Sequence, residues 1–247
     1  MIAEIVVADD IAAWTEQAVS DILALAADSI AERGRFVLCL AGGSTPSSVY
    51  DALATDRRSA SIDWTAVALL LGDERCVPPD DPASNELMVR QRLLVPLGID
   101  PSQLLRLRGE RAPAEAARLA EAELSSLLGG LPAAGPPDRA IDLVLLGLGD
   151  NGHTASLFPG LSWRFRPDRW VIEDYVEVAS MWRLSLTPTI LSAARNVEYL
   201  VAGPAKAEIV ARVVEGPEDP VVLPAQAIRP ERPARWLLDQ SAAALLR

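Results

Sequence analysis

The chain has 247 residues, of which 50% are hydrophobic and 23% are charged, the balance of a folded globular protein rather than of a disordered or fibrous chain. Its formal net charge of −11 argues against a surface built to bind nucleic acid or an anionic membrane, because both partners need a basic field. No stretch approaches the roughly 18 apolar residues of a membrane span, and residues 1–10 lack a basic-then-apolar leader, so we expect a cytoplasmic protein.

The first predicted element is a helix over 10–32, which Gly34 follows as a stop signal. One side of this helix carries residues at three-to-four spacing, namely Ile11, Trp14, Ala18, Ile22, Leu25, Ser29 and Ile30. The next elements are a strand at 36–41, a helix at 46–57, a strand at 67–71 and helices at 85–95 and 113–128. The last are a strand at 141–148, a helix at 188–195, a strand at 197–202, a helix at 204–215 and a strand at 235–238.

The predicted strands are continuous runs of Val, Ile and Leu, which are typical of parallel strands buried on both faces. Strands and helices alternate, which predicts an α/β fold with a doubly wound, mostly parallel sheet. The Gly/Pro-rich stretch at 129–137 could mark a domain boundary, but the alternation continues on both sides of it. We therefore expect one domain over 1–247.

Ligands of such sheets bind at the carboxyl ends of the strands, so the residues that follow each apolar run are the candidates for function. Gly42, Gly43, Ser44 and Thr45 follow the strand at 36–41 and precede Pro46. Two glycines allow a tight bend and a close approach to a ligand, and Ser44 or Thr45 could cap the next helix while its amides face an anion or sugar hydroxyls. A plain strand-to-helix turn is the alternative.

Charged residues follow the strand at 67–71, in the order Gly72, Asp73, Glu74 and Arg75. On this evidence alone they form either a solvated turn or part of a site. Their place at the carboxyl end of a buried strand keeps the functional interpretation open.

The segment 147–154 follows the strand at 141–148 and satisfies the G-x-G-x-x-G dinucleotide pattern, with Glu173 and Asp174 about 20 residues on, where a ribose-binding acid would stand. A dinucleotide fold needs a sustained helix after the third glycine, whereas Pro159 and Gly160 interrupt this one within two turns. We therefore expect no nicotinamide cofactor.

The same segment contains His153, the only histidine and the one side chain whose unperturbed pKa is near neutrality. A lone histidine is more often a surface or core residue, but a glycine-rich loop at a strand's carboxyl end favours chemistry. We interpret His153 as a general base. With one histidine and with Cys39 and Cys76 in separate apolar surroundings, we expect reduced thiols and neither a disulfide nor a metal site.

Lys206 is the only lysine among 23 basic residues, and it lies in the first turn of the helix predicted at 204–215. A cation is unfavourable at that end of the helix dipole, so a bound anion would explain Lys206 better than local stability does. A solvated surface lysine is the alternative.

Five motifs make the chain resemble the 6-phosphogluconolactonases, which are related in fold to glucosamine-6-phosphate deaminases and isomerases. They are AGGSTP at 41–46, GDERCVPPDDPASN at 72–85, NGHTASLFPG at 151–160, RLSLT at 183–187 and GPAKAEIV at 203–210. The resemblance implies a three-layer α/β/α sandwich with a Rossmann-like sheet that binds a phosphosugar without a redox cofactor.

The resemblance also implies roles for single residues. His153 is expected to be the general base, Arg75, Arg183 and Lys206 to bind substrate and phosphate, and Gly42, Gly43, Ser44 and Thr45 to line the site. Asp73 is expected to be a polar site residue without an assigned role. The family usually has Asp-Gly-His where this chain has Asn151 before Gly152 and His153, so Asn151 can hydrogen-bond to the histidine but adds no charge. Asp150 is the candidate to compensate.

The expected activity is hydrolysis of 6-phospho-D-glucono-1,5-lactone to 6-phosphogluconate, a step of the oxidative pentose phosphate pathway, by a monomer or weak homodimer. Two alternatives are a glucosamine-6-phosphate deaminase on the same scaffold and a non-catalytic sugar-phosphate-binding protein. The Ser-Leu-Phe-Pro-Gly run after His153 favours the lactonase over the deaminase. A serine or cysteine hydrolase is disfavoured because no G-x-S-x-G elbow is present.

Overall fold

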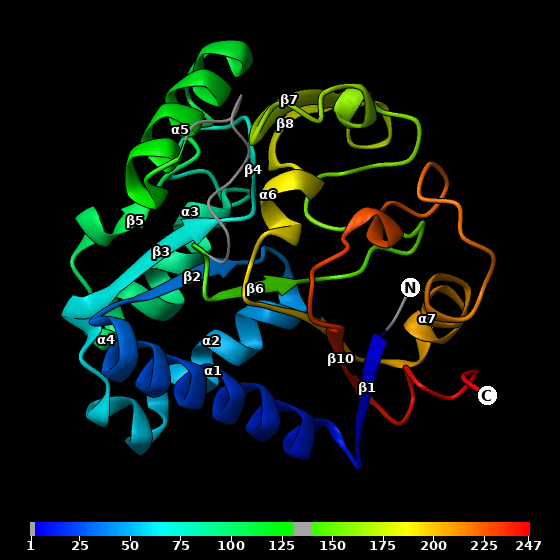
Figure 1. Ribbon diagram of the computed structural model, residues 1–247, viewed down its shortest axis with the longest axis horizontal. Helices are drawn as coiled ribbons and strands as arrows, with labels where there is room; N and C mark the ends of the chain where they lie inside the picture. Colours follow the sequence, from blue (N-terminus) through cyan, green and yellow to red (C-terminus); the bar gives the residue numbers. More distant parts are fainter. Residues whose placement is uncertain (1–2, 131–139) are drawn as a thin grey trace.

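Seven parallel strands form the central sheet of the computed structural model, which describes residues 3–130 and 140–247 (Figure 1). Every strand pair in this sheet is parallel, in the order β1-β10-β9-β6-β2-β3-β5. The strands are β1 (Ala3–Ala8), β2 (Phe36–Leu40), β3 (Val67–Leu71), β5 (Leu104–Leu105), β6 (Leu143–Leu146), β9 (Asn196–Val201) and β10 (Ala234–Asp239). Side chains of β2 and β6 are buried throughout, as their continuous apolar runs predict.

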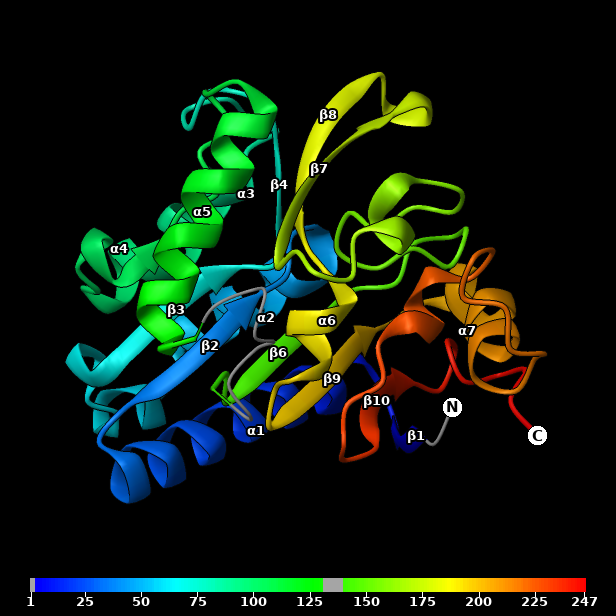
Figure 2. The same ribbon diagram turned by 45° about the horizontal axis from the view of Figure 1, so that its top comes forward.

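Helices cover both faces of this sheet, which confirms the predicted α/β sandwich. Figure 2 shows α1 (Ile11–Arg33) below the sheet and α5 (Pro113–Leu128) and α6 (Pro188–Ser192) above it. The other α-helices are α2 (Ser44–Thr55), α3 (Asn85–Val89), α4 (Val95–Leu97) and α7 (Ala207–Val214), with a π-helical turn at Arg90–Leu94 between α3 and α4. No helix in the described residues is long and apolar enough to cross a membrane.

The long first helix follows its predicted pattern except at one end. Trp14, Ala18 and Ile22 are buried, and the Trp14 indole Nε1 donates a hydrogen bond to the Leu237 carbonyl of β10 at 2.9 Å. Gly34 ends the helix in the left-handed conformation at φ 72°, as predicted. Ile11 belongs to the same spacing but is 57% exposed, because it stands in the first turn, before the stripe that packs on the sheet begins.

The strand order contains a switch point between β2 and β6. From β2 the chain continues outward through β3 to β5, and from β6 it continues outward in the other direction through β9 to β10. Loops leaving β2 and β6 therefore diverge and leave a crevice at their carboxyl ends, which is where open α/β sheets bind ligands.

A second sheet lies beyond this crevice and was not predicted. It contains β4 (Asp73–Arg75), β8 (Met181–Leu186) and β7 (Val171–Val176) in antiparallel order β4-β8-β7, and its β7–β8 hairpin projects from the body in Figure 2. Asp73 and Glu74 are only 7% and 2% exposed, which excludes the solvated turn considered for the residues after β3. The second sheet carries charged side chains from β3's carboxyl end toward the crevice.

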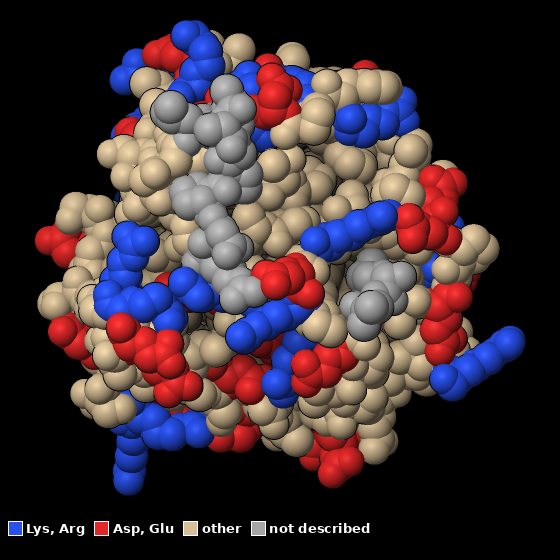
Figure 3. Space-filling view, viewed as in Figure 1, with Lys and Arg blue, Asp and Glu red and all other residues tan. Residues whose placement is uncertain are grey.

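Acidic and basic side chains are interspersed over the face shown in Figure 3, without a broad basic area. Cys39 is buried in β2 and Cys76 is partly buried, and both are free thiols. Most of the Gly/Pro-rich stretch at 129–137 lies outside the described residues, so the single domain over 1–247 stays a prediction from the sequence.

Candidate active site

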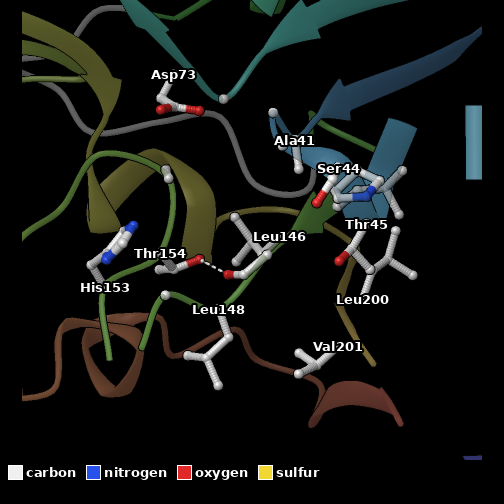
Figure 4. Close-up of a pocket in the computed structure, with 18 of the residues that line it drawn as sticks. Ala41, Ser44, Thr45, Asp73, Leu146, Leu148, His153, Thr154, Leu200 and Val201 are labelled. Carbon is white, nitrogen blue, oxygen red and sulfur yellow. Dashed lines mark hydrogen bonds between the residues drawn. The ribbon is translucent and has the colours of Figure 1, made fainter. Parts of the chain in front are cut away.

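A cleft of about 350 Å³ opens at the switch point. It lies at the carboxyl ends of β2, β3, β6 and β9 and is closed on one side by β4 and β8. It brings together these predicted site residues: Gly42, Gly43, Ser44, Thr45, Asp73, Arg75, His153, Arg183 and Lys206. Figure 4 shows Asp73 and His153 on one side of the pocket and Ser44 and Thr45 on the other.

The glycine loop presents backbone rather than side chains. Gly43 is the N-cap of α2 at φ 97°, a conformation that favours glycine, and no side chain caps the helix. The prediction that Ser44 or Thr45 caps α2 is therefore wrong, because the helix already begins at Ser44. The first N–H groups of a helix have no partner within it, so the start of α2 offers donors and a positive dipole end to the cleft.

His153 stands in a tight loop after β6. The Gly149 N–H donates to the His153 carbonyl at 2.8 Å, and the Gly152 N–H, at φ 80°, donates to the Gly149 carbonyl at 2.9 Å. The imidazole stacks on Phe158 with ring centroids 4.0 Å apart. Backbone and ring contacts thus orient the imidazole at the edge of the cleft.

Asn151 sets the tautomer of this imidazole. Its Oδ1 accepts the His153 backbone N–H at 3.2 Å and lies 2.6 Å from His153 Nδ1. Because the same oxygen acts as the acceptor of the backbone N–H, Nδ1 carries the ring proton. The other nitrogen, Nε2, keeps its lone pair and can accept a proton from water.

Burial lowers the pKa of His153 to about 4. The negative charges of Asp73 and Asp150 oppose this shift, and the positive charges of Arg183 and Lys206 add to it. The imidazole is therefore neutral at pH 7, which is the form that a general base requires.

Replacing Asn151 with aspartate should move the acidic limb of the kcat/KM profile to higher pH by about one unit or more. The new carboxylate beside Nδ1–H favours the imidazolium and so raises the pKa of His153 from about 4. Below that raised pKa the base is protonated and activity is lost. A pH profile of kcat/KM measures the shift, and an unmoved limb would show that position 151 does not act on the imidazole.

Arg75 and Arg183 are paired directly across the β4–β8 ladder. Like charges in such a position are destabilising unless an opposite charge balances them. Neither guanidinium forms an ion pair with a carboxylate of the described residues; Arg75 donates to the Ala83 carbonyl at 2.7 Å, and Nε of each arginine is buried without a hydrogen-bond partner. Burial lowers the pKa of Arg183. Two under-neutralised cations in one cleft favour an anionic ligand.

Lys206 completes the positive side of the cleft. It ends the 3₁₀ turn Pro204–Lys206 and is followed directly by α7. Its Nζ forms an ion pair with Asp150, which holds the pKa of Asp150 below its usual range. Asp150 was expected to compensate for Asn151, and its charge does raise the pKa of His153, although less than the charge of Asp73 does; the same carboxylate is paired with Lys206.

Comparison with known proteins identifies the family. The family model described as glucosamine-6-phosphate isomerases/6-phosphogluconolactonase matches residues 9–237. The chain belongs to this family. It is 35% identical over 219 residues to a 6-phosphogluconolactonase of Nostoc sp., covering 88% of each chain. Its fold matches the 6-phosphogluconolactonase of Trypanosoma brucei with a TM-score of 0.84 and 27% identity over 99% of both chains.

A monomeric glucosamine-6-phosphate deaminase also matches, with a TM-score of 0.81 over 98% of this chain and 99% of that one, at 23% identity. That likeness concerns the fold alone. The predicted resemblance to the family of 6-phosphogluconolactonases and glucosamine-6-phosphate isomerases is confirmed.

Several residues that line the cleft were not predicted from the sequence. Phe158, Thr154 and Ala155 line it. The Thr154 hydroxyl donates to the Gly147 carbonyl at 2.8 Å, and Thr154 is labelled in Figure 4. All three lie in the NGHTASLFPG motif, so this motif could have identified them as site residues. Asn85 and Ser156 also lie in the quoted motifs, but they are buried and reach the cleft only through hydrogen bonds to Asp73, which no sequence pattern shows.

Proposed function

We propose that the protein hydrolyses 6-phospho-D-glucono-1,5-lactone to 6-phosphogluconate, with His153 as the general base. One observation carries the proposal: the only histidine presents Nε2 in the same cleft as two arginines that have no carboxylate partner in the part of the chain that the structure describes. The cations suit a phosphate, and the imidazole suits activation of water. The family relationship supports the same reaction.

In this mechanism the lactone lies with its C1 carbonyl near His153. Nε2 takes a proton from water as the water oxygen attacks C1, and the proton then passes to the ring oxygen as the C1–O bond breaks. Hydrolysis of a lactone transfers no electrons to a cofactor, so none is required. Backbone N–H groups at the start of α2 are candidates to stabilise the oxyanion.

The phosphate provides an anchor remote from the reacting carbon. Arg75, Arg183 and Lys206 are the groups that we propose bind it, by directional bonds from guanidinium and by point charge from ammonium. Anchoring converts binding energy into orientation of C1. The negative charge of the substrate's phosphate also favours the imidazolium. It therefore raises the pKa of His153, which is low in the free protein, and makes His153 a stronger base.

The reaction is tested with freshly prepared 6-phosphogluconolactone in an assay coupled to oxidation of 6-phosphogluconate, corrected for spontaneous hydrolysis. Turnover above the spontaneous rate supports the lactonase. Ammonia release from glucosamine 6-phosphate would instead support a deaminase, and saturable binding without turnover would support a sugar-phosphate-binding protein. We further propose that the protein acts in the cytoplasm as a monomer or weak homodimer.

Replacing Lys206 with alanine should lower kcat/KM for the phosphorylated lactone at least tenfold more than for plain gluconolactone, because only the first substrate carries the anion that Lys206 is proposed to bind. Both substrates are measured with the same enzyme preparation. Equal losses on the two lactones would exclude Lys206 as a phosphate anchor.

A further inference from the structure

Asn85 has no role in the proposed mechanism, but it contacts two residues that line the cleft, Asp73 and Gly42. It is the first residue of α3 and is only 1% exposed. Its Nδ2 donates to the Asp73 carbonyl at 2.8 Å and to Asp73 Oδ1 at 3.2 Å. One side-chain amide thus holds both the backbone and the carboxylate of Asp73.

The other end of the same amide lies against Gly42. A Cβ placed on Gly42 would lie 2.2 Å from Asn85 Oδ1, so the amide oxygen fills the space of a side chain at position 42. This buried oxygen has no hydrogen-bond partner among residues 3–130 and 140–247. A buried acceptor without a partner is unfavourable for stability, so hydrogen bonding of this oxygen does not explain its close approach to Gly42.

Asn85 is itself rigidly held. Its backbone N–H donates to Glu74 Oε1 at 2.7 Å, while the Glu86 N–H and the Ser84 hydroxyl donate to Glu74 Oε2 at 2.8 and 3.0 Å. The buried carboxylate of Glu74 therefore fixes the start of α3 onto β4. The position of the Asn85 amide relative to Asp73 follows from this attachment.

The Asp73 carboxylate also connects to the histidine loop. Its Oδ2 accepts a hydrogen bond from the Ser156 hydroxyl at 2.5 Å, and Ser156 lies three residues after His153. Asp73 is thus the junction of three segments: the glycine loop through Asn85, β4 itself, and the histidine loop through Ser156.

The charges that face the imidazole come from four places. They are Asp73 on β4, Arg183 on β8, Lys206 before α7 and Asp150 in the histidine's own loop. Asp150 is paired with Lys206, and Asn151 is neutral. Asp73 is the group that most strongly raises the pKa of His153 against the lowering caused by burial. Its carboxylate is therefore the larger of the two negative charges that can stabilise an imidazolium formed during catalysis.

We propose that Asn85 is a positioning residue for the hydrolysis: its amide holds the Asp73 carboxylate and the Gly42 backbone at a fixed separation, so that the charge of Asp73 faces the imidazolium of His153. The catalytic part of this inference rests on the proposed function. The connection from Asn85 through Asp73 to the histidine loop does not.

The test replaces Asn85 with aspartate, which has the same shape. A protonated carboxyl group at position 85 can donate one O–H to Asp73 in place of the two hydrogen bonds of the amide, whereas an ionised one repels the Asp73 carboxylate. Burial beside Asp73 and Glu74 raises the pKa of the introduced carboxyl group. We expect kcat relative to wild type to fall about tenfold between pH 5.5 and pH 8, with KM changing less than about twofold.

Asn196→Asp is the matched control. The Asn196 amide also donates to the backbone carbonyl of an aspartate, Asp142, at 2.9 Å, but it stands at the first residue of β9, away from the cleft. Its kcat relative to wild type should not vary with pH. The proposal would be overturned if kcat of Asn85→Asp relative to wild type were also independent of pH, or if the substitution changed KM alone.

Two further measurements keep the proposal testable if Asn85→Asp does not fold or if the wild type does not hydrolyse the lactone. Ser156→Ala removes the bond to the other Asp73 oxygen and should lower kcat about tenfold with little change in KM; wild-type kcat would contradict the proposal. Because His153 is the only histidine, its Cε1–Hε1 cross-peak in the NMR spectrum at pH 7.5 is unambiguous. The chemical shifts of this cross-peak should change in Ser156→Ala and in folded Asn85→Asp, and should be unchanged in Asn196→Asp.

The NMR measurement separates the two proposals. A wild type without lactone hydrolysis refutes the proposed function, while the cross-peak still reports whether Asn85 and Ser156 act on His153. An unmoved cross-peak in both variants would refute the positioning role even in an active enzyme.

Discussion

Replacing His153 with glutamine will lower kcat on 6-phosphogluconolactone by about 100-fold or more. Glutamine retains an amide that can hydrogen-bond to Asn151 but has no basic nitrogen to take a proton from water. KM should change little, because the cations of the cleft remain. Steady-state kinetics, corrected for spontaneous hydrolysis, give both constants.

Thermal unfolding of the same variant provides the control, since a folded protein with normal KM isolates the chemical step. His153 lies in a loop and is only partly buried, so we expect the fold to persist. Turnover close to wild type in the folded variant would remove His153 from the mechanism.

Replacing Gly149 with alanine will lower kcat by about 100-fold, the effect expected when a catalytic group is displaced by about 1 Å. A Cβ at position 149 would lie 2.0 Å from both Cε1 and Nδ1 of His153, so the imidazole must leave its place. The displacement also breaks the alignment of Nδ1 with Asn151 Oδ1. Kinetics on the phosphorylated lactone measure the loss.

Gly147→Ala is the control for this variant. Gly147 belongs to the same loop, but a Cβ placed on it meets no atom within 4 Å. We expect kcat within about threefold of wild type for Gly147→Ala, because the effect of alanine depends on contact with the imidazole. Equal losses in the two variants would mean that loop rigidity, rather than the position of His153, is what alanine changes.

The central sheet was predictable because burial on both faces leaves a continuous apolar run in the sequence. The strand predicted at 67–71 has those bounds in β3, and the run at 141–148 contains β6 with two extra residues at each end. The first strand, Ala3–Ala8, and the two-residue β5 were missed. Both are edge strands, which need less burial and so give a weaker pattern.

The second sheet could not be predicted from periodicity. β4 consists of Asp73, Glu74 and Arg75, three charged residues with no β-forming pattern. It is a strand because β8, more than 100 residues later in the chain, pairs with it, and because buried Glu74 receives hydrogen bonds from α3. Such partners are invisible to a local pattern.

The sequence by itself determined the parallel sheet, the family, and the residue types that surround the cleft, because local apolar runs and short motifs indicate each of them. Only the tertiary structure decided how these residues act. It paired Lys206 with Asp150, aligned Arg75 with Arg183, and joined Asn85 to Gly42 and Asp73. The physical reason is that hydrogen bonds and charges act over a few ångströms in space, and the fold chooses which distant residues come within that range.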